Sequence, residues 1–212
     1  DEGQKIITET ELRAAANLGW KNNTHTPDPK IFERLRHYKH RLMAIDWGGG
    51  GEEDVSFTTA AVVGLLGDGS MEVVYGRRLL FLNNPLAEAM ELMKIYNTFH
   101  CDHLAHDYNG AGSLHEVFML QAGLSMDRVV PFVYYRSAAQ DLVVYHGSED
   151  DHHRSYYHLD KARSLKFLCE LIKLQRIRFF DWDFVDVDNR GLLHDFLSLV
   201  EHKTDTARAG EV

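Results

Sequence analysis

Residues 42–51 read Leu-Met-Ala-Ile-Asp-Trp-Gly-Gly-Gly-Gly, an apolar run that ends in one acid and a glycine stretch. An apolar run of this length, bounded by glycines, is typical of a buried β-strand followed by a flexible hairpin. Residues 104–112, Leu-Ala-His-Asp-Tyr-Asn-Gly-Ala-Gly, repeat this arrangement. Asp46 and Asp107 are therefore expected at the ends of two strands.

The composition is that of a globular protein. The chain has 212 residues, of which 44% are hydrophobic, enough for one sizeable core. The longest apolar runs, 60–66 and 79–82, fall well short of the ~20 residues that cross a bilayer, and we expect no signal peptide. Cys101 and Cys169 show no paired spacing, so neither a disulfide framework nor a structural zinc is indicated. We expect a protein of a reducing cytoplasm without a membrane partner.

The net charge of −9 argues against a protein that coats nucleic acid through an overall positive potential. The negative net charge does not exclude a metal-dependent nuclease. These enzymes need clustered carboxylates, and the divalent cations they bind offset part of the local negative charge.

The pattern from residue 42 onward predicts a mixed sheet. Three strands are expected close together, at 42–47, 57–66 and 71–81. The Gly-Asp-Gly-Ser turn at 67–70 predicts a tight hairpin, and therefore an antiparallel meander. An amphipathic helix from Asn84 to Phe99 then crosses the sheet and delivers a parallel strand at 103–107. That topology places Asp46 and Asp107 side by side.

Helices and strands alternate in the second half of the chain. Ser113 and Glu116 form a capping-box pattern, which predicts the start of a helix. Val129 to Arg136 is the next expected strand, and Asp160 is expected to cap a long helix. Residues 1–40 are interpreted as an arm or linker with a helical stretch at 9–16, and a short basic helix at 30–41 leads into the domain, which is expected to occupy residues 41–212.

Two acids at neighbouring strand ends repel each other unless a cation or proton intervenes, and oxygen ligands suit divalent ions. A structural alternative stays open, because a single strand-end Asp such as Asp46 is often only a cap or turn former. The glycines at 48–51 are not followed by Gly-Lys-Ser/Thr, so a Walker-type ATPase is excluded and a permissive hairpin is favoured. His106 is expected on the opposite face of the sheet from Asp107 and is not assigned a catalytic role.

Four segments resemble the nuclease domain of tailed-phage terminase large subunits, a ribonuclease H-like family. They are residues 44–50 (Ala-Ile-Asp-Trp-Gly-Gly-Gly), 106–112 (His-Asp-Tyr-Asn-Gly-Ala-Gly), 157–164 (Tyr-His-Leu-Asp-Lys-Ala-Arg-Ser) and 176–179 (Arg-Ile-Arg-Phe). The resemblance spans roughly residues 38–206. It implies an α/β fold with a ribonuclease H-like mixed sheet, in which an antiparallel three-strand meander and parallel strands are flanked by helices.

The resemblance also implies an endonuclease that cuts concatemeric double-stranded viral DNA during genome packaging, in the cytoplasm of the infected bacterial host. Asp46 matches the first acid of the family and Asp107 the second, and both are implied ligands of two Mg²⁺ or Mn²⁺ ions ~3.5–4 Å apart. The third acid follows a further strand in the family. We expect it beyond Val212, with Asp205 as the alternative within the chain.

Four basic residues are candidates for contacts with the DNA backbone: Lys161, Arg163, Arg176 and Arg178. Cations near a helix C-terminus are also favoured for purely local reasons. The resemblance implies further partners, namely an ATPase domain of the same polypeptide that precedes residue 1, the portal and the small terminase subunit.

Two other functions are considered. An actin-like or sugar-kinase-like ATPase has a similar sheet, but it needs a second domain and a second glycine-rich phosphate hairpin, which the sequence does not show. A noncatalytic docking module of the packaging motor would use the acidic surface for binding, with the two aspartates retained but inactive.

Overall fold

The computed structural model describes residues 4–48, 57–79, 84–135, 141–148, 154–181 and 195–201. The strands are β1 (Gln4–Lys5), β2 (Ala16–Lys21), β3 (His40–Asp46), β4 (Thr58–Leu65), β5 (Met71–Leu79), β6 (His103–Asp107), β7 (Val129–Tyr135), β8 (Val143–His146), β9 (Tyr156–Asp160), β10 (Ile177–Asp181) and β11 (Val200–Glu201). The helices are α1 (Glu9–Ala15), α2 (Pro29–Leu35), α3 (Pro85–Thr98), α4 (Gly112–Gln121), the 3₁₀ helix η1 (Met126–Arg128) and α5 (Lys161–Lys173). Within these described ranges, no helix is long and apolar enough to span a membrane.

Short-range signals explain where three of the helices begin. Thr8 caps α1 through a reciprocal capping box with Glu11. Asn84 accepts a hydrogen bond from the Ala87 N–H at the start of α3. Asp160 accepts one from the Arg163 N–H at the start of α5. The predicted caps Asn84 and Asp160 are confirmed.

Nine of the described strands form one mixed sheet in the order β2-β10-β5-β4-β3-β6-β7-β9-β8. The strands β3, β4 and β5 pair antiparallel, as the predicted meander requires. Parallel pairs join β3 to β6, β6 to β7, and β7 to β9, while β8 closes the edge antiparallel to β9. Because β3, β6, β7 and β9 all run in one direction, their carboxyl ends lie along the same edge of the sheet.

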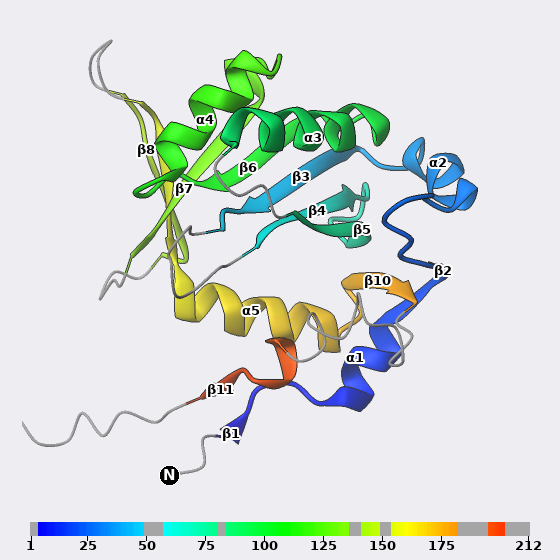
Figure 1. Ribbon diagram of the computed structural model, residues 1–212. Coiled ribbons are helices and arrows are strands. Elements are labelled where there is room, and N and C mark those ends of the chain that lie inside the picture. The colour runs from blue at the N-terminus through cyan, green and yellow to red at the C-terminus, as the bar shows by residue number, and fades with distance from the viewer. Residues whose placement is uncertain are drawn as a thin grey trace, which may run out of the picture.

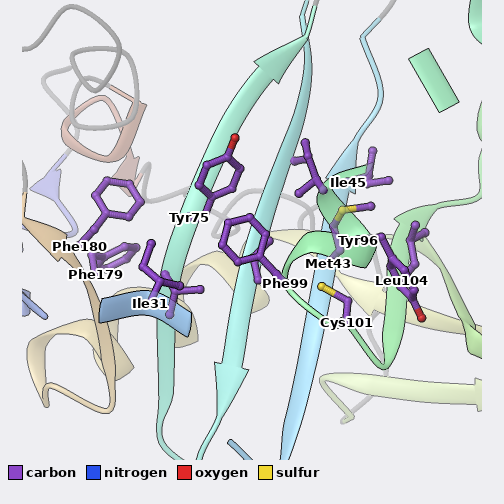
Figure 2. Close-up of a cluster of buried hydrophobic side chains, with 14 of the residues drawn as sticks. Ile31, Met43, Ile45, Tyr75, Tyr96, Phe99, Cys101, Leu104, Phe179 and Phe180 are labelled. Atoms are coloured by element: carbon purple, nitrogen blue, oxygen red, sulfur yellow. The ribbon is translucent and has the colours of Figure 1, made fainter. Parts of the chain in front are cut away.

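Helices cover both faces of the sheet. Figure 1 shows α3 and α4 on one face, and α1 and α5 on the other. The face of the sheet under α3 is the more buried one. Along β4, buried residues alternate with more exposed residues, so the buried ones share one face. There the Phe99 ring lies 4.7 Å from that of Tyr75, and both join a buried cluster with Met43, Ile45 and Leu104 (Figure 2).

Much of the segment predicted as an arm or linker, residues 1–40, packs into the domain. Strand β2 pairs with β10 in the sheet. Leu12 of α1 and Ile31 of α2 are fully buried. The buried indole N–H of Trp20 donates to the Val74 carbonyl (3.0 Å). Residues 4–38 thus supply part of the fold, whereas their connection to a preceding ATPase domain stays a prediction.

A buried carboxylate, Glu72, organises the end of the sheet where β5 and β10 begin. Its side chain is inaccessible to solvent, and it accepts hydrogen bonds from Arg34 (Nε to Oε2, 2.9 Å), Tyr38 and Arg178. Burial alone would raise the pKa of Glu72, but the hydrogen bonds from Arg34 and Tyr38 and the nearby positive charges hold that pKa below its ordinary value. Three elements, α2, β5 and β10, are therefore tied together at one charge.

We expect Glu72→Gln to lower the free energy of unfolding by about 3 kcal/mol at pH 7, because two guanidinium groups lose their buried counter-charge. The pKa of Glu72 is depressed in the folded protein, so its contribution is present above the ordinary pKa of a glutamate and is lost as the pH falls through the lower, folded value. Urea unfolding at several pH values measures the difference between wild type and variant.

Glu170→Gln is the matched control, since Glu170 pairs with Lys173 on an exposed helix surface and should contribute little. The difference between wild type and Glu72→Gln should shrink at acidic pH. A difference that stays constant from neutral to strongly acidic pH would contradict the assigned role of Glu72.

Candidate metal centre

Asp46 and Asp107 come together because β3 and β6 are parallel and in register. Ile45 pairs with His106, so the next residue of each strand is an acid at the same edge of the sheet. Adjacent strands are about 4.8 Å apart. Asp46 is exposed and Asp107 is partly buried, with its Oδ1 accepting from the Asn109 N–H (2.9 Å). The predicted juxtaposition of these two residues is present.

Tyr134 of β7 and Lys161 of α5 adjoin the two acids. Burial raises the pKa of the Tyr134 phenol, and the negative charges of Asp46 and Asp107 raise it further because they disfavour a phenolate beside them. The Lys161 Nζ lies 5.2 Å from the centre of the Tyr134 ring. Two acids, one protonated phenol and one ammonium group therefore share this edge of the sheet.

The donor set at this edge fits a divalent cation. Asp46 and Asp107 present carboxylate oxygens, the ligands preferred by Mg²⁺ and accepted by Mn²⁺. In the described part of the chain, neither carboxylate forms an ion pair with a lysine or arginine. The described residues contain no group of three metal-binding side chains, and Asp205 and residues 49–56 lie outside them. The two acids thus form a partial site, which needs further ligands to complete the coordination of a metal ion.

A buried polar chain lies on the opposite face of the sheet, directly behind the acids. The Trp47 indole N–H donates to His106 Nδ1 (3.0 Å), and His106 Nε2 lies 2.8 Å from Glu116 Oε2. An indole nitrogen can only donate, so Nδ1, which also lies 3.1 Å from the Asp107 carbonyl oxygen, accepts from Trp47. Arg154 also reaches Glu116 (3.1 Å). The residues next to the two acids are therefore linked to each other and to α4.

A second set of contacts holds the backbone just after Asp46. The Trp47 ring stacks on His115, with centroids 4.3 Å apart and planes 9° apart. The Thr58 hydroxyl accepts from the Gly48 N–H (3.0 Å) and donates to Glu88 Oε1 (3.1 Å). Burial raises the pKa of Glu88. These contacts fix the direction in which the chain leaves β3.

Glu116 corrects one expectation. The sequence pattern placed it in a capping box with Ser113, but α4 starts at Gly112 and has no side-chain cap. Glu116 instead pairs with His106, ten residues earlier. Glu116 is buried one turn into α4, and no pattern in the sequence predicted its pairing with His106. The expectation that His106 points away from Asp107 is consistent with its full burial.

The four basic residues predicted to contact DNA fall at two separate places. Lys161 and Arg163 lie at the start of α5, at the same edge of the sheet as the acids, and both are exposed. Arg176 and Arg178 lie at the opposite edge, because the start of β10 pairs with the start of β5. There Arg176 Nη2 donates to the Asp68 carbonyl (2.6 Å), and Arg178 pairs with buried Glu72.

Gly112 lets α4 approach the end of β6 closely. A Cβ built on it would lie 2.0 Å from the Asp107 carbonyl oxygen, closer than any real contact. We expect Gly112→Ala to lower the free energy of unfolding by about 1–3 kcal/mol, because backbone must move to relieve the overlap. Urea denaturation measures this change.

Gly67→Ala is the control for Gly112→Ala, because a Cβ at Gly67 meets no atom within 4 Å and its φ is not in the left-handed region. It should leave stability nearly unchanged. Equal stability of the two variants would show that α4 does not approach Asp107 as described.

Comparisons with known proteins identify the fold. No family model and no curated protein sequence matches the chain. Among solved structures, the chain is similar to the nuclease domain of the large terminase subunit gp2 of bacterial virus Sf6, with 14% identity and a TM-score of 0.60 over 95% of this chain and 85% of that one.

Two structures of a single-substitution mutant of the same gp2 domain also match, over the same shares of both chains. One, with manganese and beta-thujaplicinol, has 13% identity and a TM-score of 0.60. The other, with calcium, has 15% identity and a TM-score of 0.59. The expected architecture is thereby confirmed: the chain has the ribonuclease H-like α/β fold of a phage terminase nuclease domain, with a mixed sheet flanked by helices.

Proposed function

We propose that this chain is the nuclease domain of a tailed-phage terminase large subunit, an endonuclease that cuts concatemeric double-stranded DNA during genome packaging. The observation that carries the proposal is the pairing of Asp46 with Asp107 at adjacent strand ends, without an ion-pair partner among the described residues. The likeness in fold to the gp2 nuclease domain supports it.

Asp46 and Asp107 would hold two Mg²⁺ or Mn²⁺ ions through their carboxylate oxygens. A third acid would also be required, which is expected after Val212, with Asp205 as the alternative within the chain. When bound, the two ions make water a stronger nucleophile and stabilise the negative charge on the leaving oxygen of the phosphodiester.

The protein's own groups at this edge supply binding and orientation. The Lys161 ammonium group, close to Tyr134, offers a positive charge to a DNA phosphate. The Tyr134 phenol, like an ordinary tyrosine, is protonated at neutral pH, so it can donate a hydrogen bond to a phosphate oxygen. Arg163, two residues further on in α5, adds a second exposed positive charge at the start of the same helix.

The implied setting follows from the same proposal. The substrate is double-stranded DNA in the cytoplasm of an infected bacterium. The ATPase domain of the same polypeptide would be joined to the N-terminal segment, and the portal and small terminase subunit would be partners of the assembled motor.

We expect Asp46→Asn and Asp107→Asn each to reduce plasmid cleavage in Mn²⁺ by about 100-fold or more, because each change removes a charge that holds metal while keeping the size of the side chain. Gel electrophoresis of plasmid treated with the full-length protein measures the loss. Asp127→Asn, at an exposed acid on η1, is the control and should cut normally. Undiminished cutting by Asp46→Asn would rule out this centre.

Isothermal titration with Mn²⁺ separates the enzyme from a noncatalytic docking module. We expect wild-type protein to bind Mn²⁺, and both asparagine variants to bind it at least about tenfold more weakly, because each loses one anionic ligand. Asp127→Asn again serves as the control. Wild-type protein that binds no Mn²⁺ would favour the docking module.

A further inference from the structure

A row of aromatic side chains runs from the candidate metal centre to the edge of the sheet. Asp107 of β6 pairs with Phe132 of β7, Phe132 pairs with Tyr157 of β9, and Tyr157 pairs with Tyr145 of β8. Paired residues in a sheet project from the same face. The three aromatic residues therefore continue, strand by strand, the line on which Asp107 stands.

Tyr134 extends this surface beside the acids. Its ring lies 5.2 Å from that of Phe132, two residues earlier on the same face, and Tyr145 and Tyr157 have ring centroids 5.1 Å apart. We call Phe132, Tyr134, Tyr145 and Tyr157 the aromatic row. Two ring pairs are thus close together, and the register pairing of Phe132 with Tyr157 places the two pairs on neighbouring strands of one face.

Three of the four members of the aromatic row are exposed, and Phe132 is partly buried. Tyr145 is 59% exposed, Tyr134 is 37% exposed and Tyr157 is 36% exposed. Large aromatic side chains normally contribute to a core, and a contiguous exposed group of them marks a binding surface. Since the row begins at Asp107, whatever binds it is led directly to the acids.

We propose that the aromatic row stacks the bases of an unpaired DNA strand and guides that strand to the metal centre. Sheets that bind single strands use exposed aromatic rings in this way, because every base has a flat π-face. Bases in an intact duplex are already stacked on one another, so the row can take them only where the strands have separated. Lys161, over the Tyr134 ring, supplies a positive charge for the backbone at the inner end of the row.

The charge distribution favours stacking over a general attraction for phosphate. Asp46 and Asp107 repel a phosphate backbone in the absence of metal, and the chain carries a net charge of −9. Binding of a metal-free single strand would therefore depend on the rings. The identity of the bound strand as substrate rests on the proposed nuclease function, while the stacking itself does not.

Fluorescence anisotropy with a labelled oligothymidylate of about 16 nucleotides, in EDTA and with full-length protein, tests the proposal. We expect the single strand to bind more tightly than a duplex of equal length. Tyr145→Ala and Tyr157→Ala should each weaken binding by about tenfold, because each removes one stacking platform. Tyr145→Phe should bind like wild type, since it keeps the ring and loses only the hydroxyl.

Met90→Ala is the matched control, because Met90 is 55% exposed on α3, which covers the other face of the sheet. It should leave binding unchanged. Single-strand binding no tighter than duplex binding, or equal losses in Tyr145→Ala and Met90→Ala, would overturn the proposal. So would a loss in Tyr145→Phe as large as that in Tyr145→Ala.

Asp46→Asn separates this proposal from the proposed nuclease function. The variant should bind the oligonucleotide at least as well as wild type, since it loses one repelling charge. If metal-dependent cleavage requires Asp46 but single-strand binding is unchanged in Tyr145→Ala, the proposed role of the aromatic row is wrong and the proposed nuclease function is retained. If single-strand binding requires Tyr145 but cleavage does not require Asp46, the aromatic row is retained as a single-strand binding surface and the proposed nuclease centre is wrong.

Discussion

The parallel register between β3 and β6 is the constraint on which the candidate site depends. The side-chain period of a strand is two residues, so a slip of one residue would turn Asp107 to the opposite face and separate it from Asp46. The contact between Trp47 and His106 opposes such a slip, because these are the residues directly adjacent to the two acids. Glu116 of α4 is within hydrogen-bond distance of the same histidine and so links it to that helix. A site of charged groups on one face is thus held by a buried polar chain on the other.

Local patterns were sufficient to predict the meander and the crossover. The turn at 67–70, the cap at Asn84 and the strand at His103–Asp107 all depend on residues close together in sequence, and the structure places them within a few residues of expectation. The pairing of Asp46 with Asp107 followed from these elements through the rule that crossover connections join parallel strands.

Long-range partners account for what the sequence did not reveal. Residues 16–21 gave no strong strand signal, yet β2 lies in the sheet because β10 pairs with it from the far end of the chain. Arg178 looked available for DNA, but its partner Glu72 lies 106 residues away and is fully buried. The aromatic row is similar, since its members come from three strands and only the register between those strands aligns them.

The pairing of β2 with β10 also bears on how the protein is made. The Gly19 N–H bonds to the Asp181 carboxylate across 162 residues of chain, and strand contacts of such wide separation form slowly. On the ribosome, the segment that carries Leu12 and Trp20 has no partner strand until residues 177–181 have emerged. The strands of the meander and β6 all precede β10 in the chain, so they are available to pair with one another before β10 is synthesised. Synthesis of β10 then supplies the partner strand of β2.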